Sequence, residues 1–364
     1  MNILIAVDSF KGSISSLEIA DIAIEVLKDK GHQVVTVPVS DGGEHFLDVM
    51  KTYVEGDEVQ CLSYEPSGNM IQARYLFDDK EAYIALDSIA GIEVTNHLNP
   101  RLNTTYGVGL AIKDAISRGS RKVILGVGGS TTNDGGAGML QAMGCDFFDE
   151  NDMVMTKQMN GDMIGEVHRF DAWLIDQLIS GTKFVVACDV KNPLLGEQGC
   201  ARVYAKQKGA SDQDVDILEK NMTQFAHVVE AHYKKDYSEE PGAGAAGGVG
   251  FGALALLKAK LVNGIDLIAE LSDLETKIMD ADVVIVGEGT LDTQSDFGKA
   301  PIAIAKLAKQ HDKRVIGIFG MSELDKHESL NEIHTIVPQY ANQETAINHA
   351  GKYIKKVLEN LMLD

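Results

Sequence analysis

The chain is short of basic residues, of cysteines and of long apolar runs. Among its 364 residues, 33 are Lys or Arg and 54 are Asp or Glu, so the formal net charge is −21. Nucleic acids and anionic membranes attract the opposite sign of charge, which argues against either as the main partner. The four cysteines share no CxxC or metal-ligand spacing, so we expect reduced side chains rather than a disulfide framework.

Apolar segments of membrane-spanning length are also missing. A bilayer span needs roughly 18 apolar residues, and no run in this sequence approaches that length. The first residues are apolar only from Ile3 to Val7 before an acidic residue follows, unlike a signal peptide. We therefore expect a cytoplasmic protein, and the length fits roughly two domains.

The two ends of the chain share one pattern. Apolar runs at Ile3–Val7 and Val34–Val39 predict parallel strands that flank a helix, and Ser15 with Glu18 has the spacing of a capping box at its start. Apolar strands are predicted again at Val283–Val286 and Val315–Phe319, with a helix between them. This alternation is typical of a parallel α/β sheet.

The middle of the chain differs. Val59–Tyr64, Ile71–Phe77 and Tyr83–Leu86 alternate like an antiparallel meander before helical and strand patterns return. We predict an α/β fold of two domains. Residues 1–56 and 282–364 would form a discontinuous, doubly wound domain of Rossmann or flavodoxin type, and residues 57–281 an inserted mixed α/β domain. We expect the active site in the cleft between them.

The strongest local signal is Gly126–Gly138, which reads GVGGSTTNDGGAG and holds six glycines. It follows a predicted strand, and a helix is predicted to begin near Ala137. Glycines let backbone N–H groups approach phosphate oxygens, and Ser130, Thr131 and Thr132 can donate hydrogen bonds. The alternative is a tight turn whose hydroxyls cap a helix.

A second glycine-rich segment contains a formal GxGxxG at Gly242, Gly244 and Gly247. A dinucleotide-binding fingerprint needs a strand directly before it, and the preceding residues DYSEEP make a poor strand. We interpret this segment as a wall that allows close backbone approach to a ligand or a helix.

Several carboxylates follow predicted strands. Singly, each is a common turn former or helix cap. Together with lysines in similar loops they suit a Mg²⁺–phosphate site, because acids bind the metal and lysines neutralise phosphate charge. The carboxylates are Asp8, Asp41, Asp189, Glu288 and Asp292, and the lysines include Lys11, Lys208 and Lys299.

These motifs together resemble the type I glycerate kinase family. The matching segments are DSFKGS at 8–13, SDGGE at 40–44, GVGGSTTNDGGAGMLQAMG at 126–144, DVKNPLLG at 189–196, QKGA at 207–210, PGAGAAGGVGFG at 241–252 and GEGTLDTQSDFGKAP at 287–301. The resemblance implies ATP-dependent phosphorylation of D-glycerate with Mg²⁺, with 2-phosphoglycerate favoured over 3-phosphoglycerate. One departure is Thr131, where the family usually has alanine.

The residues that we assign to this reaction fall into four groups. Nucleotide phosphates are expected on Gly128, Gly129, Ser130, Thr131, Asn133, Lys208 and Lys299. Glycerate is expected on Ser9, Lys11, Ser13 and Glu44. Candidate metal ligands are Asp134, Asp189, Glu288 and Asp292. Asp189 is the preferred proton acceptor, Asp41 is its alternative, and Lys11 is the anchor for the glycerate carboxylate.

Other readings stay open at this point. The chain could phosphorylate a different small hydroxy acid, could be a nicotinamide-dependent dehydrogenase that uses the GxGxxG, or could bind nucleotide as a regulator without catalysis. ATP and glycerate are the expected small-molecule partners, and the sequence leaves a homodimer open.

Overall fold

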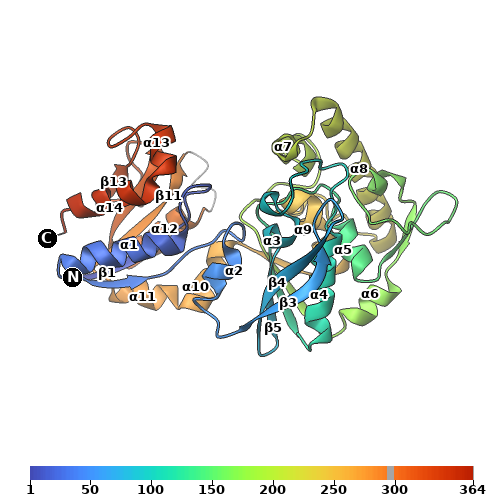
Figure 1. Ribbon diagram of the computed structural model, residues 1–364, viewed down its shortest axis with the longest axis horizontal. Coiled ribbons are helices and arrows are strands. Elements are labelled where there is room, and N and C mark those ends of the chain that lie inside the picture. Colours follow the sequence, from blue (N-terminus) through green and yellow to red (C-terminus); the bar gives the residue numbers. More distant parts are fainter. Residues whose placement is uncertain (293–298, 364) are drawn as a thin grey trace. The chain divides into compact units, whose positions relative to one another are not determined.

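The computed structural model describes residues 1–292 and 299–363, with Glu93 described by its backbone alone. Its contacts divide the chain into two compact units, which we call unit 1 and unit 2. Unit 1 holds residues 1–41, 48–54 and 263–364, and unit 2 holds residues 42–47 and 55–262. Figure 1 colours the chain from blue to red, and both of these colours lie in unit 1.

Unit 1 contains a five-stranded sheet in the order β13-β12-β11-β1-β2, in which every neighbouring pair is parallel. This confirms the predicted α/β class and its parallel sheet. Numbered by their order within the unit, the strands read 2-1-3-4-5, which is the flavodoxin-like order. The strands are β1 Asn2–Val7, β2 Gln33–Thr36, β11 Val283–Leu291, β12 Arg314–Ser322 and β13 Glu332–Thr335.

Two strands of unit 1 differ from their predicted ends. β2 ends at Thr36 rather than Val39, since Pro38 has no N–H to continue the ladder. β11 continues to Leu291 rather than Val286, because its pairing with β12 extends from Val283 to Leu291. Glu288 therefore lies within the strand and does not follow it.

Helices pack on the sheet of unit 1. The capping box of α1 is confirmed, since the Ser15 side chain accepts from the Glu18 N–H and the Glu18 carboxylate accepts from the Ser15 N–H. We expected residues 263–281 in the inserted domain, but α10 and α11 belong to unit 1, where α11 contacts β1 and α12. The helices are α1 Ser16–Asp29, α10 Gly264–Ser272, α11 Leu274–Asp280, α12 Ala300–Gln310, α13 Gln343–Asn348 and α14 Ala350–Asn360, while α2 Phe46–Met50 spans the division.

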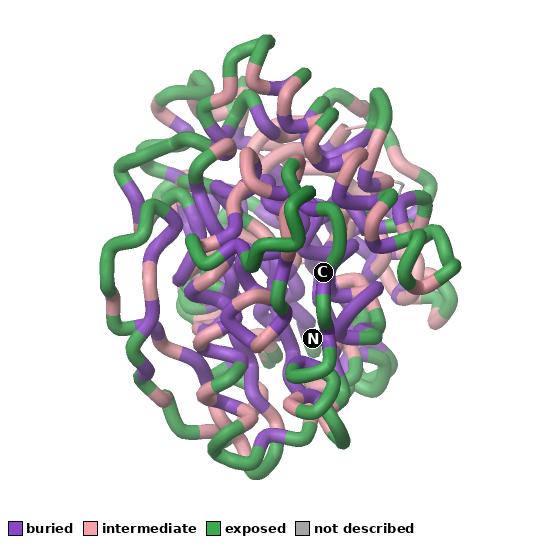
Figure 2. The backbone as a smooth tube through the Cα atoms, turned by 90° about the vertical axis from the view of Figure 1, so that its right-hand side faces the viewer, coloured by how far each residue is buried: buried purple, intermediate pink, exposed green. Residues whose placement is uncertain are grey.

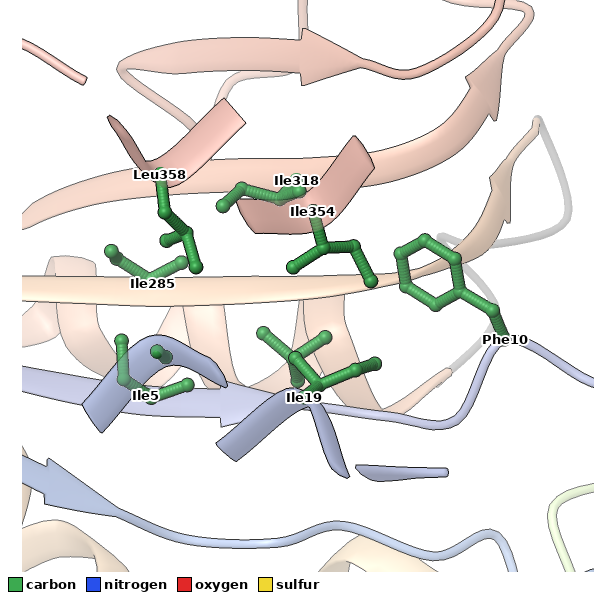
Figure 3. Close-up of a pocket in the computed structure, with 9 residues that line it drawn as sticks. Ile5, Phe10, Ile19, Ile285, Ile318, Ile354 and Leu358 are labelled. Atoms are coloured by element: carbon green, nitrogen blue, oxygen red, sulfur yellow. The ribbon is translucent and has the colours of Figure 1, made fainter. Parts of the chain in front are cut away.

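The core of unit 1 contains a small cavity with apolar lining (Figure 3). Ile5, Ile285 and Ile318 reach it from the sheet, and Ile19 of α1 and Ile354 of α14 reach it from the helices. Because the lining carries no polar side chain, it offers nothing to orient a charged ligand. We interpret it as a packing void between the sheet and its helices.

Unit 2 contains a six-stranded mixed sheet in the order β10-β9-β6-β5-β4-β3. The first four strands are parallel, while β5, β4 and β3 are joined as the predicted antiparallel meander. A small sheet pairs β7 with β8. The strands are β3 Asp57–Tyr64, β4 Met70–Asp78, β5 Glu81–Ala85, β6 Lys122–Gly126, β7 Asp146–Phe148, β8 Arg169–Asp171, β9 Lys183–Ala187 and β10 Lys260–Val262.

The helices of unit 2 surround this sheet and supply much of its core. In α8, Val215, Leu218, Met222 and Phe225 repeat at helical spacing and are buried. The helices are α3 Asp87–Ala90, α4 Tyr106–Ser117, α5 Ala137–Ala142, α6 Trp173–Leu178, α7 Cys200–Tyr204, α8 Asp212–Tyr233 and α9 Ala245–Leu256, with 3₁₀ turns η1 Ile92–Val94, η2 Met163–Glu166 and η3 Lys206–Lys208.

Burial follows the strands (Figure 2). The tube is mostly purple, for buried, along the inner strands, and green, for exposed, along many loops. Among the residues that the structure describes, no helix combines the length and apolar character that crossing a membrane would need.

Candidate functional site

In unit 1, polar groups gather where the strand order reverses. From β1 the chain crosses to β2 on one side, whereas β11 leads on to β12 and β13 on the other. Ligands of open α/β sheets bind at this point, beyond the carboxyl ends of the strands. The Asp8 N–H donates to the Gly287 carbonyl at 2.9 Å and ties the loop after β1 to β11. We call the group Asp8, Lys11, Asp41, Glu288, Asp292 and Lys299 the switch-point rim.

The rim holds an exposed lysine and a half-buried carboxylate that pair with each other. Lys11 Nζ donates to Asp41 Oδ2 at 2.5 Å, with 70% of the Lys11 side chain exposed. Nearby, the Ser9 N–H donates to Asp8 Oδ1 at 2.7 Å, while the Ser13 hydroxyl donates to the Ile347 carbonyl. Ser9 and Lys11 are thus available to a ligand at the rim, whereas the hydroxyl proton of Ser13 is used within the protein.

Lys299 lies on the other side of the rim, at the start of α12. Its ammonium approaches Glu288 Oε2 at 3.5 Å and Asp292 Oδ2 at 3.3 Å. The structure therefore brings together two candidate metal ligands and a candidate phosphate-binding lysine. The segment 293–298 of the predicted GEGTLDTQSDFGKAP motif lies outside the described residues.

In unit 2, three parallel strands end in register at one edge of the sheet. Ala85 of β5 pairs with Gly126 of β6, and Gly126 pairs with Ala187 of β9. Two residues further along each strand come Asp87, Gly128 and Asp189. Asp87 and Asp189 therefore follow the two strands that pair with β6, and a Cβ on Gly129 would lie 3.0 Å from Asp87 Cβ. Asp189 was expected at a strand end, whereas Asp87 was missed, although it follows the strand Glu81–Ala85 in the same way.

The loop after β6 packs closely on the SDGGE segment. A Cβ on Gly128 would lie 2.3 Å from Gly43 Cα, and a Cβ on Gly42 would lie 2.5 Å from the Ala187 carbonyl. The Gly128 N–H donates to the Gly42 carbonyl at 2.9 Å. No side chain fits between these backbones, so glycine is required there. Glu44, a predicted glycerate ligand, follows and lies 3.5 Å from the His45 ring.

The hydroxyls of this glycine loop, residues 126–138, have different partners. Gly129 is exposed and Gly128 half-buried, while Ser130 is buried, with 7% of it exposed. Thr131 is fully buried, and its hydroxyl and N–H both donate to the Ala90 carbonyl, which gives a structural reason for the hydroxyl at this position. The contacts of Thr131 favour a structural role for this residue over direct contact with nucleotide.

Lys208 reaches the same loop from η3 and is buried, with only 3% of it exposed. Its ammonium donates to Ser130 Oγ at 2.7 Å and to the Thr132 carbonyl at 2.8 Å. Burial lowers the pKa of Lys208 to about 8, against an opposing effect of Cys200 and Asp134. A buried ammonium held only by neutral oxygens is costly, which points to a functional reason for its position.

Asp134 is fully buried and its carboxylate is occupied by protein donors. Oδ2 accepts from the N–H and hydroxyl of Thr105 at 2.8 and 2.7 Å, and Oδ1 accepts from the Gly136 N–H at 3.1 Å. Burial raises the pKa of Asp134, although these hydrogen bonds oppose the shift. The contacts favour a structural role, in which Asp134 holds the turn into α5, over the metal binding that we expected.

Asn133 lies between these residues and is also fully buried. Both polar atoms of its amide, together with Thr132 Oγ1, have no hydrogen-bond partner among the described residues. Buried polar groups are normally paired. The hydrogen bonding of the glycine loop is therefore incomplete at these three atoms. Asn133 has no exposed surface through which to touch a nucleotide directly.

The second glycine-rich segment packs against the first. The Gly135 N–H donates to the Gly247 carbonyl at 3.0 Å, and a Cβ on Gly247 would lie 2.1 Å from the Thr132 carbonyl. A Cβ on Gly244 would lie 2.3 Å from the Pro193 carbonyl. The GxGxxG is not preceded by a strand and forms the predicted wall for close backbone approach, here toward the glycine loop and the loop after β9.

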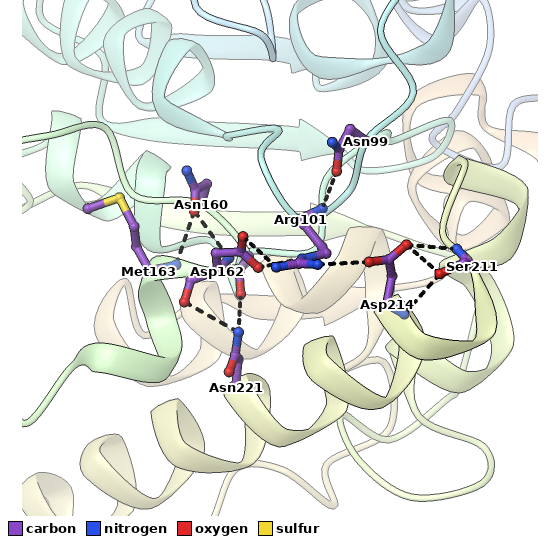
Figure 4. Close-up of polar contacts among 9 residues, drawn as sticks. Asn99, Arg101, Asn160, Asp162, Met163, Ser211, Asp214 and Asn221 are labelled. Carbon is purple, nitrogen blue, oxygen red and sulfur yellow. Dashed lines mark hydrogen bonds and ion pairs between the residues drawn. The ribbon is translucent and has the colours of Figure 1, made fainter.

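Charged side chains hold the surrounding segments in place (Figure 4). Arg101 donates to both carboxylate oxygens of Asp162, at 2.7 and 3.0 Å, and to Asp214 at 2.9 Å. Asp214 completes the capping box of α8 with Ser211. We call Arg101, Asp162, Asp214 and Ser211 the Arg101 cluster. It ties the start of α8, just after Lys208, to the segment that leads to Thr105.

No preformed metal cage is present in the part of the chain that the structure describes, since no three His, Cys, Asp or Glu residues converge as one would require. Mg²⁺ commonly takes only one or two protein carboxylates, with waters and substrate phosphates as its other ligands. The oxygen-only donors Asp87 and Asp189 beside Gly128 fit that chemistry.

Known proteins resemble this chain over most of its length. A model described as the glycerate kinase family matches residues 3–363. The chain belongs to the glycerate kinase family. It is 35% identical to glycerate kinase of Bacillus subtilis strain 168, over 99% of this chain and 97% of that one. It is 37% identical to glycerate 2-kinase of Escherichia coli K12, over 88% of this chain and 85% of that one.

A solved structure gives the same family and fold. A crystal structure assigned to glycerate kinase 2 of Salmonella typhimurium LT2 superimposes with a TM-score of 0.82 at 33% identity. The match covers 99% of this chain and 96% of that one. The resemblance that the sequence motifs indicated is thus confirmed.

Proposed function

We propose that this protein transfers the γ-phosphoryl group of ATP to a hydroxyl of D-glycerate. We favour the 2-hydroxyl, and hence 2-phosphoglycerate, since the Escherichia coli relative is named a glycerate 2-kinase. The acidic composition and the use of ATP support a cytoplasmic enzyme. The observation that carries the proposal is the edge of unit 2, where Asp87 and Asp189 follow the strands on either side of β6 and the glycine loop after β6 holds the buried Ser130–Lys208 pair.

The nucleotide phosphates bind the glycine loop in this proposal. Gly129 offers its backbone N–H at the exposed tip and Ser130 adds a hydroxyl, while Gly128, whose N–H donates to the Gly42 carbonyl, allows close backbone approach. Such preorganised donors stabilise the charge on transferring phosphoryl groups. Thr131 and Asn133, which we also expected here, act from within the loop and shape it.

Glycerate binds the switch-point rim in this proposal. Lys11 is exposed and its ammonium can exchange Asp41 for the glycerate carboxylate at small cost, because exposed ion pairs contribute little. Asp41 would then accept a hydrogen bond from a glycerate hydroxyl, and Ser9 would assist. Glu44 stays a candidate for a hydroxyl contact.

Asp189 is the proposed proton acceptor, with Asp41 as the alternative. As the glycerate oxygen forms its bond to the γ-phosphorus, the bond to the ADP oxygen breaks and the hydroxyl proton passes to the carboxylate. Asp189 is half-buried at the end of β9, on one side of Gly128. Asp87, on the other side, is the proposed carboxylate for the Mg²⁺ that accompanies ATP. That ion would neutralise phosphate charge.

Glu288 and Asp292 are weaker candidates for the metal than Asp87. Both approach Lys299, whose charge already compensates theirs. Lys299 stays a candidate for phosphate, since it lies at the start of α12 beside the point where the strand order reverses.

The proposal is tested by measuring ADP release from Mg²⁺–ATP with D-glycerate, with other short hydroxy acids, and with no acceptor. We expect release that depends on D-glycerate, and a product that enolase converts without added mutase, as 2-phosphoglycerate would be. Preference for another acid would change the assigned acceptor. A protein that binds ATP but releases no ADP with any acceptor would support the regulator, and binding of NAD would support the dehydrogenase.

The proton acceptor is tested by comparing Asp189→Asn with Asp41→Asn. Removing a general base costs about a hundredfold to ten-thousandfold in rate, so Asp189→Asn should lower kcat with KM for either substrate little changed. Asp41→Asn should mainly raise KM for glycerate. If Asp189→Asn keeps full kcat while Asp41→Asn loses it, the two roles are reversed.

A further inference from the structure

The buried hydrogen bond between Lys208 and Ser130 determines which way the Ser130 hydroxyl points. An ammonium group has three N–H donors and no acceptor. Lys208 Nζ lies 2.7 Å from Ser130 Oγ, so the serine oxygen accepts this bond and cannot donate its own proton to the charged lysine. The Thr132 carbonyl takes a second ammonium proton at 2.8 Å. The Ser130 O–H is thereby directed away from Lys208.

That hydroxyl has no acceptor among the residues that the structure describes, and Ser130 directly follows the exposed Gly129 in the chain. Among the described residues it donates no hydrogen bond, although Ser130 is only 7% exposed. The two residues that precede Ser130 are Gly128 and Gly129, which have no side chains to take the proton. A donor kept unpaired beneath a glycine tip suits an acceptor that arrives from outside, such as a phosphate oxygen.

The charge of Lys208 depends on its surroundings, which offer no carboxylate within hydrogen-bond reach among the described residues. The titratable groups that act on it are Cys200 of α7 and Asp134 of the glycine loop. Glu219 of α8 acts in turn on Cys200. Burial is the largest effect and lowers the pKa of Lys208 to about 8, so the ammonium loses its proton within an accessible pH range.

We propose that Lys208 is a positioning residue whose protonation controls the donor that Ser130 presents to the phosphates of ATP. When Lys208 is protonated, the Ser130 hydroxyl donates outward to a phosphate oxygen. When Lys208 gives its proton to solvent, the neutral amine gains a lone pair and accepts the Ser130 hydrogen bond. The outward donor is then lost, together with the positive charge behind it.

This inference rests on the proposed function and adds a pH dependence to its nucleotide site. Affinity for Mg²⁺–ATP should be constant below the pKa of the free protein and should weaken as the pH rises above about 8. Because a hydrogen bond to a charged group contributes about 1.5–3 kcal/mol, the full loss corresponds to about a tenfold to hundredfold weaker affinity. Binding near pH 8 should also take up a proton, since the phosphate charge favours the ammonium form.

The test follows binding of Mg²⁺–ATP by calorimetry, and KM for ATP, from pH 7 to 9.5. It compares the unaltered protein with Lys208→Met, Ser130→Ala and the control Lys206→Met, whose lysine is exposed and paired with Asp212. We expect the unaltered protein and Lys206→Met to lose affinity above pH 8. Lys208→Met and Ser130→Ala should bind Mg²⁺–ATP more weakly than the unaltered protein at pH 7. Their affinity should then fall little further as the pH rises to 9.5.

Ser130→Ala keeps the test decisive if Lys208→Met does not fold, as a thermal melt would reveal. A pH dependence that persists in Ser130→Ala would overturn the proposal, because Lys208 would then act on ATP without the hydroxyl. A pH-independent affinity in the unaltered protein would also overturn it, even where glycerate-dependent ADP release stands. Absence of that release would count against the proposed function alone, since the binding measurement needs no turnover.

Discussion

The two units carry charged groups at their strand ends in different ways. In unit 1, Lys11 is exposed and pairs with Asp41, and Lys299 pairs with Glu288 and Asp292. In unit 2, Lys208 is buried, and its hydrogen bonds to the described residues go to two neutral oxygens. The exposed Lys11 can exchange its partner at little cost, whereas buried polar groups are expensive to disturb. The switch-point rim of unit 1 can thus rearrange when a ligand binds. The glycine loop of unit 2 holds its groups in a fixed arrangement before a ligand binds.

Glycines in the two units show the same difference. A Cβ added at Gly12, in the loop after β1, would meet no atom within 4 Å. A Cβ added at Gly128 would lie 2.3 Å from Gly43 Cα, which real Cβ atoms never tolerate without a backbone shift. Gly12 has open space around it, although its φ of 68° is one that side chains rarely adopt, while the glycine loop is confined by its neighbours.

The largest expected effect on stability and activity comes from Gly128→Ala, which adds a methyl group where the glycine loop is closely packed. The added methyl must push the SDGGE backbone away, and overpacking of this kind costs about 3 kcal/mol in the free energy of unfolding. We also expect most of the ATP-dependent activity to be lost. Denaturant unfolding and steady-state kinetics measure both.

Gly119→Ala is the matched control for Gly128→Ala. Gly119 has a φ of 102° and open space around its Cβ position, so only backbone strain of about 1 kcal/mol is expected. If the two variants lose equal stability and keep equal activity, close packing does not confine the glycine loop.

A smaller effect is expected from Arg101→Met, which removes the centre of the Arg101 cluster. The lost charge-assisted hydrogen bonds are partly exposed, so we expect about 1–2 kcal/mol less stability. Arg202→Met removes a single exposed pair with Asp216 and should cost less. If both variants lose the same free energy of unfolding, the Arg101 cluster stabilises the fold no more than an ordinary surface ion pair does.

The Arg101 cluster should also show a pH dependence. Hydrogen bonds from Ser211 and Arg101 lower the pKa of Asp214 to about 2, below its ordinary value of 3.8. A depressed carboxyl pKa stabilises the fold above pH 4, and this contribution is lost as the pH falls toward 2. The stability difference between the unaltered protein and Arg101→Met should therefore shrink in that range, as unfolding measured at several pH values would reveal.

The smallest effect is expected from Ile354→Val, which enlarges the apolar cavity of unit 1. Losing one buried methylene costs about 1 kcal/mol. Since the cavity has no polar lining, KM and kcat should not change. A changed KM for glycerate would mean that this cavity is coupled to the rim.

Much of the fold could be predicted because local signals agreed with the final packing. The capping box at Ser15 and Glu18 forms as its spacing indicated, and the apolar runs at the two ends of the chain join one parallel sheet. The helix α14 was not predicted, although Ile354, Val357 and Leu358 share its buried face. Nothing local indicates that α14 packs on α1, since that contact links opposite ends of the chain.

The site was less predictable, because sequence reveals residue types but not which atoms are already engaged. Asp134 looked like a metal ligand beside glycines, yet its oxygens are taken by Thr105 and Gly136. Asp87 was missed because its strand read as part of a meander, and its importance depends on the register of β5 with β6. The QKGA motif indicated Lys208 as a candidate residue. It did not indicate that the Lys208 side chain is buried.

The division of binding between the two units is tested most directly by measuring KM for both substrates in Ser130→Ala and Lys11→Met. The account predicts that Ser130→Ala raises KM for ATP by about tenfold or more and leaves KM for glycerate nearly unchanged. Lys11→Met should show the reverse, with the effect confined to glycerate. If Ser130→Ala weakens only glycerate and Lys11→Met weakens only ATP, the assignment of substrates to the glycine loop and the switch-point rim is contradicted.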